Sequence, residues 1–382
     1  MIEKNSLKIN IVGDFCSKNV SNLKFGRKLD LRLKEGNLNV VNFEAPISIP
    51  KCNPSHKSGP HLSQSVESPS FLERNGFNVI SLANNHILDY GEEAAKATIK
   101  AFNSSTILGI GNFHDAYEAR YLDVHGIRIG LIAIVQCEFG VHVDESFKNE
   151  LGVAWMCHPY VDEQIIKARK ECDYLIVIPH AGLELFDLPL PELKSLYRHF
   201  IDMGADAVIG GHPHVPQCWE IYKEHPIVYS LGNFCFDDNC IDKLWYFGLI
   251  AELICKDGHV SLIVELIHYD AKNSIVELSN NAEILVHIEK VNKLFKNEEK
   301  YLETVNKHCI EMLSTYRELN EMSGYFKPNL KKMFRLILSI LKRKILKFPE
   351  LAFDESHYIN NIRCEPHRWV QSRIFELTKT TE

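Results

Sequence analysis

The sequence predicts an α/β sandwich, in which short buried strands alternate with helices. Two observations support this fold class. Apolar strand-like runs recur up to about residue 270 and alternate with segments of helical periodicity. Clusters of carboxylate, amide and imidazole side chains stand where several of these runs end, and open α/β folds bind their ligands at the carboxyl ends of strands.

Each expected element has a local reason. Strand-like apolar runs stand at 7–13, 38–43, 77–82, 121–135, 173–179 and 206–209. Helices are expected from Ser68-Pro69 to Gly76, from Gly91 to Phe102 and from Pro191 to Gly204, because proline favours a first helical turn and glycine ends a helix. Paired apolar runs around turns predict β-hairpins within 121–135, 218–230 and 247–268.

The character of the sequence changes from about residue 281, where helical periodicity continues without catalytic clusters. We therefore expect a main domain over 1–275 and a helical C-terminal region over 281–382. Within that region, residues 330–348 carry seven basic side chains and no acidic one. Such a basic amphipathic helix either lies on an anionic membrane surface or packs its apolar face on the protein, and we favour packing.

Composition excludes some functions and compartments. The 43 basic and 50 acidic residues give a formal charge of −7, which argues against nucleic acid as the main partner. The eleven cysteines form no C-x-x-C pair, so reduced thiols are expected. Residues 1–7 contain no apolar run of signal-peptide length, and we expect a cytoplasmic protein. Peripheral contact with the inner face of the membrane through 330–348 is the open alternative.

The segment from Gly210 to Val215 carries the clearest chemical signal. An apolar run ends at two glycines, and His212 and His214 follow two residues apart. Because glycines allow a sharp turn at a strand end, both imidazoles can face one point. Neutral imidazole suits zinc, iron or manganese, although an isolated His-x-His also occurs in ordinary surface turns.

Further polar clusters follow other strand-like runs, and they argue against a surface turn as the explanation of His212 and His214. They contain Asp14, Glu44, the pair Asn84-Asn85 with His86, and His180 with Glu184. These groups also bind divalent cations. For any single one of them a turn or cap role stays open. We expect Asp89 to be structural, as a cap for the helix that begins at about residue 91.

Taken in order, these segments resemble the CapA-like poly-γ-glutamate capsule synthesis proteins, a branch of the metallophosphatase (calcineurin-like phosphoesterase) superfamily. The resemblance covers roughly residues 7–270 and implies a four-layer α/β/β/α sandwich with a helical appendage. It rests on these motifs: Gly13-Asp14, Asn42-Phe43-Glu44, Ala83-Asn84-Asn85-His86 with Asp89 and Gly91, His180-x-Gly182-x-Glu184, Gly211-His212-Pro213-His214 and Tyr229-Ser230-Leu231-Gly232-Asn233-Phe234.

The resemblance implies two divalent metal ions, of manganese, iron or zinc. It places Asp14 and His214 on one ion and His180 and His212 on the other, with Glu44 and Asn85 as bridging or paired ligands. Two such ions clamp a phosphoryl or similar group and lower the pKa of a bound water to give hydroxide. The resemblance also makes His86 the catalytic acid beside the metals.

One position departs from the superfamily pattern. A histidine usually stands two residues after the first aspartate, whereas here Cys16 occupies that position. Either Cys16 is not a ligand or one metal is weakly held, and a site with one metal or without catalysis stays open.

Four residues near these motifs are candidates for substrate binding. Asn84 and Glu184 stand beside the expected ligands, and Lys57 and His61 lie in the long polar loop 48–65 that follows Glu44. A solvated loop with incidental charges explains Lys57 and His61 equally well.

Two functions follow from this sequence. The first is a metal-dependent, phosphoesterase-like hydrolase of the CapA type, acting on an anionic polymer or phosphoester in capsule or exopolymer (poly-γ-glutamate-like) metabolism. The second is a non-catalytic, metal-containing partner of a membrane-bound polymer synthesis or export complex. The retained His86 favours the enzyme, and the missing histidine at Cys16 favours the partner.

Overall fold

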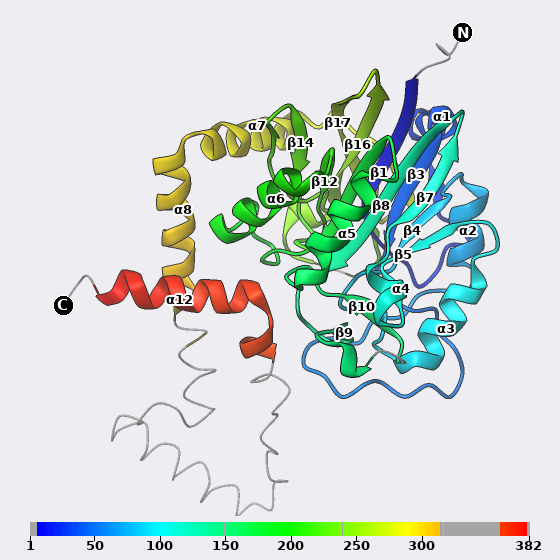
Figure 1. The fold of residues 1–382 in the computed structure, drawn as a ribbon, viewed down its shortest axis with the longest axis horizontal. Helices are drawn as coiled ribbons and strands as arrows, with labels where there is room; N and C mark the ends of the chain where they lie inside the picture. The colour runs from blue at the N-terminus through cyan, green and yellow to red at the C-terminus, as the bar shows by residue number, and fades with distance from the viewer. Residues whose placement is uncertain (1–5, 148–149, 239, 314–315, 317–359, 380–382) are drawn as a thin grey trace, which may run out of the picture. The chain divides into compact units, whose positions relative to one another are not determined.

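The computed structural model describes residues 6–147, 150–238, 240–313, 316 and 360–379, and its ribbon is shown in Figure 1. The basic helix expected at 330–348 lies outside the described residues. The chain divides into two compact units. The first comprises Met1–Ser55 with His61–Tyr301, and the second comprises His56–Pro60 with Leu302–Glu382.

The larger sheet of the first unit contains, among the described residues, nine strands in the order β2-β18-β17-β16-β1-β3-β4-β5, with β15 also paired to β1. Strands β1, β3, β4 and β5 run parallel, so their carboxyl ends meet at one edge. The strands span Ser6–Cys16 (β1), Lys24–Phe25 (β2), Leu38–Phe43 (β3), Val79–Ser81 (β4), Thr106–Leu108 (β5), Asn233–Phe236 (β15), Phe247–Lys256 (β16), His259–Asp270 (β17) and Ile275–Leu278 (β18).

A second sheet has the order β13-β14-β12-β11-β8-β7, counting only described strands. Here β8, β11, β12 and β14 run parallel and bring a second set of carboxyl ends together. The near-continuous apolar run of β11 is buried throughout, as expected for a parallel strand covered on both faces. The strands span Arg120–Val124 (β7), Ile127–Val135 (β8), Tyr174–His180 (β11), Ala207–Ile209 (β12), Trp219–Tyr222 (β13) and His225–Val228 (β14).

Helices cover the outer face of each sheet, and the expected layered sandwich is confirmed (Figure 1). Helices α1 (Arg27–Glu35), α2 (Ser68–Arg74) and α3 (Gly91–Ala101) add buried side chains to the core of the larger sheet. Helices α5 (Pro159–Arg169) and α6 (Pro191–Met203) pack on β11 and β12. One continuous apolar core joins the two sheets, since Ile11 and Val40 cluster with Ile176 and Ile209.

The expected local elements are found close to their sequence signals. Antiparallel pairs β7–β8, β13–β14 and β16–β17 confirm the three hairpins. Helices α2, α3 and α6 confirm the three predicted helices. The smaller elements are β6 (Ile110–Gly111), β9 (Val141–His142) and β10 (Gly152–Ala154), which form a small sheet, with α4 (Phe113–Tyr117) and the 3₁₀ turns η1 (Glu145–Phe147) and η2 (Lys243–Tyr246).

The C-terminal part is helical, as expected. Helix α7 (Ala282–Lys296) begins close to the expected start of the helical region at 281. It nevertheless belongs to the first unit, because Ile284 and Ile288 pack into the core of that unit. Helix α8 (Glu298–Glu311) runs across the division at Tyr301. In the second unit the hydroxyl of Tyr316 lies 2.6 Å from Nδ1 of His367, two residues into α12 (Glu365–Lys379). No helix among the described residues has the length and hydropathy to cross a membrane.

Candidate metal centre

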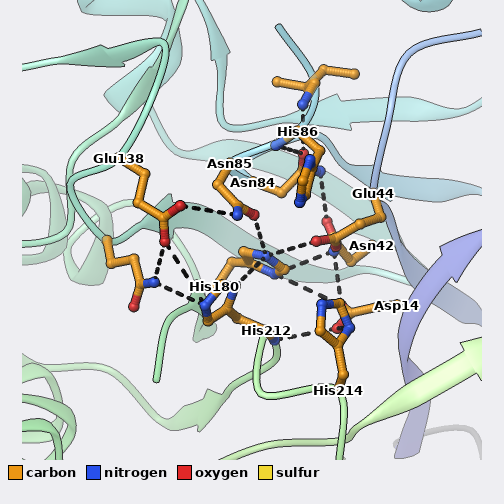
Figure 2. A network of polar contacts seen from close by, with 12 residues as sticks. Asp14, Asn42, Glu44, Asn84, Asn85, His86, Glu138, His180, His212 and His214 are labelled. Carbon is orange, nitrogen blue, oxygen red and sulfur yellow. Dashed lines mark hydrogen bonds and ion pairs between the residues drawn. The ribbon is translucent and has the colours of Figure 1, made fainter. Parts of the chain in front are cut away.

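The carboxyl ends of the parallel strands of both sheets meet at one buried cluster of polar side chains (Figure 2). Strand β1 supplies Asp14, and the residue after β3 is Glu44. Strand β11 ends at His180, and the turn after β12 carries His212. These four residues are at most 3% exposed, so the fold brings charged groups from distant parts of the sequence into a site shielded from solvent.

One half of the cluster has the composition of a metal site. Glu44, His180 and His212 each turn one ligand atom to a common point, with these atoms within 4.8 Å of one another. Nε2 of His180 lies 3.1 Å from Oε1 of Glu44 and 3.2 Å from Nδ1 of His212. The side-chain oxygen of Asn85 lies 3.2 Å from the same His180 nitrogen. Two imidazoles, a carboxylate and an amide oxygen therefore converge.

The other half contains Asp14 and His214. Oδ2 of Asp14 lies 3.5 Å from Nδ1 of His214, and its Oδ1 lies 3.7 Å from Nδ1 of His180. Asp14 also accepts the backbone N–H of His212 at 3.3 Å. The structure places Asp14 beside His214 and His180 beside His212, and the assignment of each pair to a metal ion stays a prediction. The two halves adjoin through His180.

Cys16 lies in apolar surroundings. Cys16 is 3% exposed and packs in an apolar cluster with Ala45, Leu62, Phe236 and Trp245. Burial, followed by the nearby Glu44 carboxylate, raises the pKa of Cys16 well above its usual range. Of the two alternatives for Cys16, the packing supports the one in which it is not a ligand.

The backbone around the two histidines turns in a way the sequence did not indicate. His212 and His214 themselves adopt positive φ, at 96° and 60°. Non-glycine residues in such conformations cost about 1–3 kcal/mol each and cluster at functional sites. The preceding glycines serve close packing: a Cβ on Gly210 would lie 2.3 Å from the carbonyl oxygen of Tyr229. The expected turn is present, and the histidines hold its unusual conformation.

His86 is held by a carboxylate that the sequence analysis assigned elsewhere. Its Nδ1 lies 2.7 Å from Oδ2 of Asp89, and both side chains are buried. The same Asp89 oxygen accepts the backbone N–H of Leu62 at 2.7 Å. Helix α3 has Tyr90 at its N-cap and no side-chain cap, so the prediction that Asp89 caps this helix is wrong. Asp89 orients the His86 ring instead.

Several residues of the cluster were not predicted as site residues. Asn42 donates to Oδ1 of Asp14 at 2.8 Å and also bonds Glu44. The side-chain oxygen of Asn233 lies 2.9 Å from Nδ1 of His214. Glu138 and Gln136 follow β8, directly after a predicted strand, as the other site residues do. The same strand-end signal would have found Gln136 and Glu138.

The four predicted substrate-binding residues have different surroundings. Asn84 is fully buried, donates to Oδ1 of Asn42 at 3.0 Å and accepts the backbone N–H of His86 at 3.2 Å. Glu184 is exposed on the loop after β11. The ring of His61 lies 2.7 Å from the carbonyl oxygen of Ser55. Lys57 belongs to His56–Pro60 in the other compact unit, and its role stays a prediction.

Burial dominates the electrostatics of the cluster. It raises the pKa of Glu44 well above the usual carboxyl range, with the Asp14 carboxylate as the next contribution. Burial also lowers the pKa of His180, which favours the neutral imidazole that metals bind. Oε1 of Glu44 is buried without a hydrogen-bond partner among the described residues. A cation beside this oxygen would stabilise the charged carboxylate and satisfy the atom.

The family model and the curated relatives that match this chain agree on one family. A family model described as bacterial capsule synthesis protein PGA_cap matches residues 20–238, more than half of the chain. The capsule biosynthesis protein CapA of Bacillus anthracis is 32% identical over 253 residues, which are 62% of this chain and 61% of the relative. The PGA biosynthesis protein CapA of Bacillus subtilis strain 168 is 32% identical over 200 residues, 51% of this chain and 52% of that one.

The chain thus spans between about half and three fifths of the length of these curated relatives. Among solved structures, a hypothetical protein from Thermus thermophilus aligns with a TM-score of 0.43 and 16% identity, covering 68% of this chain and 98% of that one.

Proposed function

Because this chain belongs to the family of bacterial capsule synthesis proteins described as PGA_cap, we propose that it is a metal-dependent hydrolase-like protein acting in capsule or exopolymer metabolism. The substrate we propose is an anionic polymer of poly-γ-glutamate type or a phosphoester. The names of the Bacillus relatives support the polymer. The observation that carries the hydrolase proposal is the convergence of Glu44, His180 and His212 at one buried point.

The residues present fit a divalent cation in the His180 half of the cluster. Two imidazoles and a carboxylate are a common catalytic zinc set, and iron or manganese accept the same donors. Oε1 of Glu44, which accepts no hydrogen bond from the described residues, is the atom that such an ion would satisfy. We propose Asn85 as a further oxygen ligand, since its side-chain oxygen lies 3.2 Å from Nε2 of His180.

We propose weaker binding of a second ion on Asp14 and His214. His214 turns Nδ1 to Asn233, and the Cys16 thiol lies among apolar side chains. This half of the cluster therefore offers a metal ion fewer ligand atoms than the His180 half. When bound, the ions would polarise a phosphoryl or carbonyl oxygen and lower the pKa of a bound water.

A side chain of the protein would donate the proton to the leaving group. His86 directs Nδ1 to Asp89 at 2.7 Å, which leaves Nε2 as the nitrogen that exchanges a proton. The Asp89 carboxylate fixes the ring orientation and stabilises the protonated imidazole, as carboxylates beside catalytic histidines do. Burial of both side chains excludes water from this contact. We propose His86 as the catalytic acid and Asp89 as its positioning residue.

Metal content is the test that comes first. Protein purified without chelators or affinity metal is analysed by mass spectrometry beside Glu44→Ala and His212→Ala. We expect one to two equivalents of manganese, iron or zinc in the wild type and a loss in both variants. Phosphoesters and γ-glutamyl polymers are then screened as substrates. Negligible metal in wild-type protein, even after reloading, would refute the hydrolase proposal.

A second function is a non-catalytic, metal-containing partner of a membrane-bound polymer synthesis or export complex. The packing of Cys16 in an apolar cluster favours this second function. Without a ligand at this position the second metal site has fewer ligands, and a non-catalytic partner does not need a complete second site. About one equivalent of tightly bound metal with no turnover of either substrate class would support this function over the hydrolase.

A further inference from the structure

Glu138 lies outside the group of converging ligand atoms but touches two of the side chains that supply them. It follows β8 on the loop that leaves the second sheet, and its side chain is 11% exposed. Figure 2 shows this carboxylate on the far side of Asn85 and His212 from Glu44. It therefore lies where it can orient both residues from behind.

The first contact determines which end of the Asn85 amide enters the cluster. Oε2 of Glu138 accepts the Asn85 amide N–H at 3.0 Å. With its nitrogen held by a carboxylate, the amide directs its oxygen to His180, at 3.2 Å from Nε2. A carboxylate can only accept, so it excludes the flipped amide, which would present a donor to a cation. Glu138 therefore selects the amide orientation that can bind metal.

The second contact reaches His212 through Gln136. Oε1 of Glu138 accepts a hydrogen bond from the amide nitrogen of Gln136. The same Gln136 nitrogen lies 2.9 Å from Nε2 of His212. The Gln136 oxygen accepts the backbone N–H of Gly182 at 2.8 Å, so the amide is fixed with its nitrogen toward the imidazole. Glu138 therefore helps to hold the His212 ring, with Nδ1 turned toward His180.

We propose that Glu138 is a positioning residue for the metal centre, which holds Asn85 with its oxygen inward and, through Gln136, fixes the ring of His212. This inference rests on the proposed metal-binding function and adds a residue that acts through two ligands at once. Glu138→Gln would keep the size of the side chain while removing the charge and the exclusive acceptor character. Outer partners of metal ligands typically contribute about 10–100-fold in metal affinity.

The experiment measures the Zn²⁺ dissociation constant by competition with a chelating dye, together with the melting temperature of the metal-free protein. Wild type is compared with Glu138→Gln, Glu138→Asp and Glu145→Gln. Glu145 is an exposed carboxylate in the 3₁₀ turn η1, which follows β9, and it controls for the change in net charge. We expect Glu138→Gln to bind Zn²⁺ about 10–100-fold more weakly, Glu138→Asp to fall between, and Glu145→Gln to match wild type.

A double variant separates positioning from a merely structural role. If Glu138 acts partly through Asn85, then Glu138→Gln has a smaller effect in an Asn85→Ala background than in wild type. A structural role would instead lower the melting temperature of the metal-free protein and leave the affinity of the folded protein unchanged. That result, equal affinity of Glu138→Gln and wild type, or an equal loss in Glu145→Gln would overturn the proposal. Wild-type protein that binds no Zn²⁺ would overturn the proposed function as well.

Discussion

Gly13 is the position where one added methyl group should disturb both the stability of the fold and the candidate metal site. It lies in β1 next to Asp14, at a register shift against β3. A Cβ at Gly13 would lie 1.7 Å from the carbonyl oxygen of Gly232, whereas real Cβ atoms essentially never approach closer than 3.0 Å. The two backbones would have to separate by about 1.3 Å or more to admit alanine, as overpacked cores do.

The expected cost has two parts. The separation breaks the hydrogen bond from the Asp14 N–H to the carbonyl oxygen of Gly232, 3.1 Å long, and an unsatisfied buried N–H costs about 1–3 kcal/mol. Overpacking typically costs about 1–3 kcal/mol in addition. We therefore expect Gly13→Ala to lower the free energy of unfolding by about 2–6 kcal/mol. Because Asp14 moves with the strand, Zn²⁺ affinity should fall as well.

The matched control is Gly126→Ala in the turn between β7 and β8. Gly126 has φ of 83° and open space around its Cβ position, so alanine meets only the cost of the left-handed backbone, about 1–2 kcal/mol. Urea denaturation followed by tryptophan fluorescence gives both free energies, and dye competition gives the Zn²⁺ affinities. Our reasoning is refuted if Gly13→Ala costs no more than Gly126→Ala, or if it binds Zn²⁺ as tightly as wild type.

Three further predictions address other parts of the molecule. Cys16→Ala should retain the wild-type metal content, and loss of metal in Cys16→Ala would instead make Cys16 a ligand. In the wild-type protein the Cys16 thiol should resist alkylation, because burial raises its pKa. Asp89→Asn should keep the metal but lower hydrolysis about tenfold or more, as His86→Gln should also do, and unchanged turnover would remove its positioning role. The hydrogen bond to Asp187 raises the pKa of His287, so its contribution is present below the ordinary histidine pKa and is lost as pH rises through the folded value. His287→Gln should therefore destabilise by less than about 1 kcal/mol near pH 5.5 and have no effect near pH 9 in thermal melts, since the pair is partly exposed; equal effects at both pH values would contradict this.

Local signals were sufficient where burial and turn chemistry acted within a short segment. Helix α6 begins at Pro191 and ends before Gly204, because proline and glycine act on the backbone at their own positions. The run that forms β11 is apolar throughout because both faces of this parallel strand are covered. The strand-end rule also found Asp14, Glu44, His180 and His212 before their contacts were known.

The roles of individual side chains were harder to predict. Asp89 precedes a helix and has the composition of a cap, yet its carboxylate bonds His86 and the backbone of Leu62. Asn233 follows a Leu-Gly pair that reads as a turn, yet its side-chain oxygen meets His214. In both cases the partner is chosen by the path of the chain through the site, and residue type alone permits either role.

The sequence by itself determined the alternation of strands and helices, the family and the donor groups that stand at strand ends. Periodicity, turn residues and motif order are local properties, so the residues that carry them are sufficient. Only the tertiary structure decided which donors share a point, that Cys16 packs among apolar side chains, and that Glu138 meets both Asn85 and His212. These facts depend on the register and crossing of strands far apart in the chain, which side-chain chemistry at one position cannot specify.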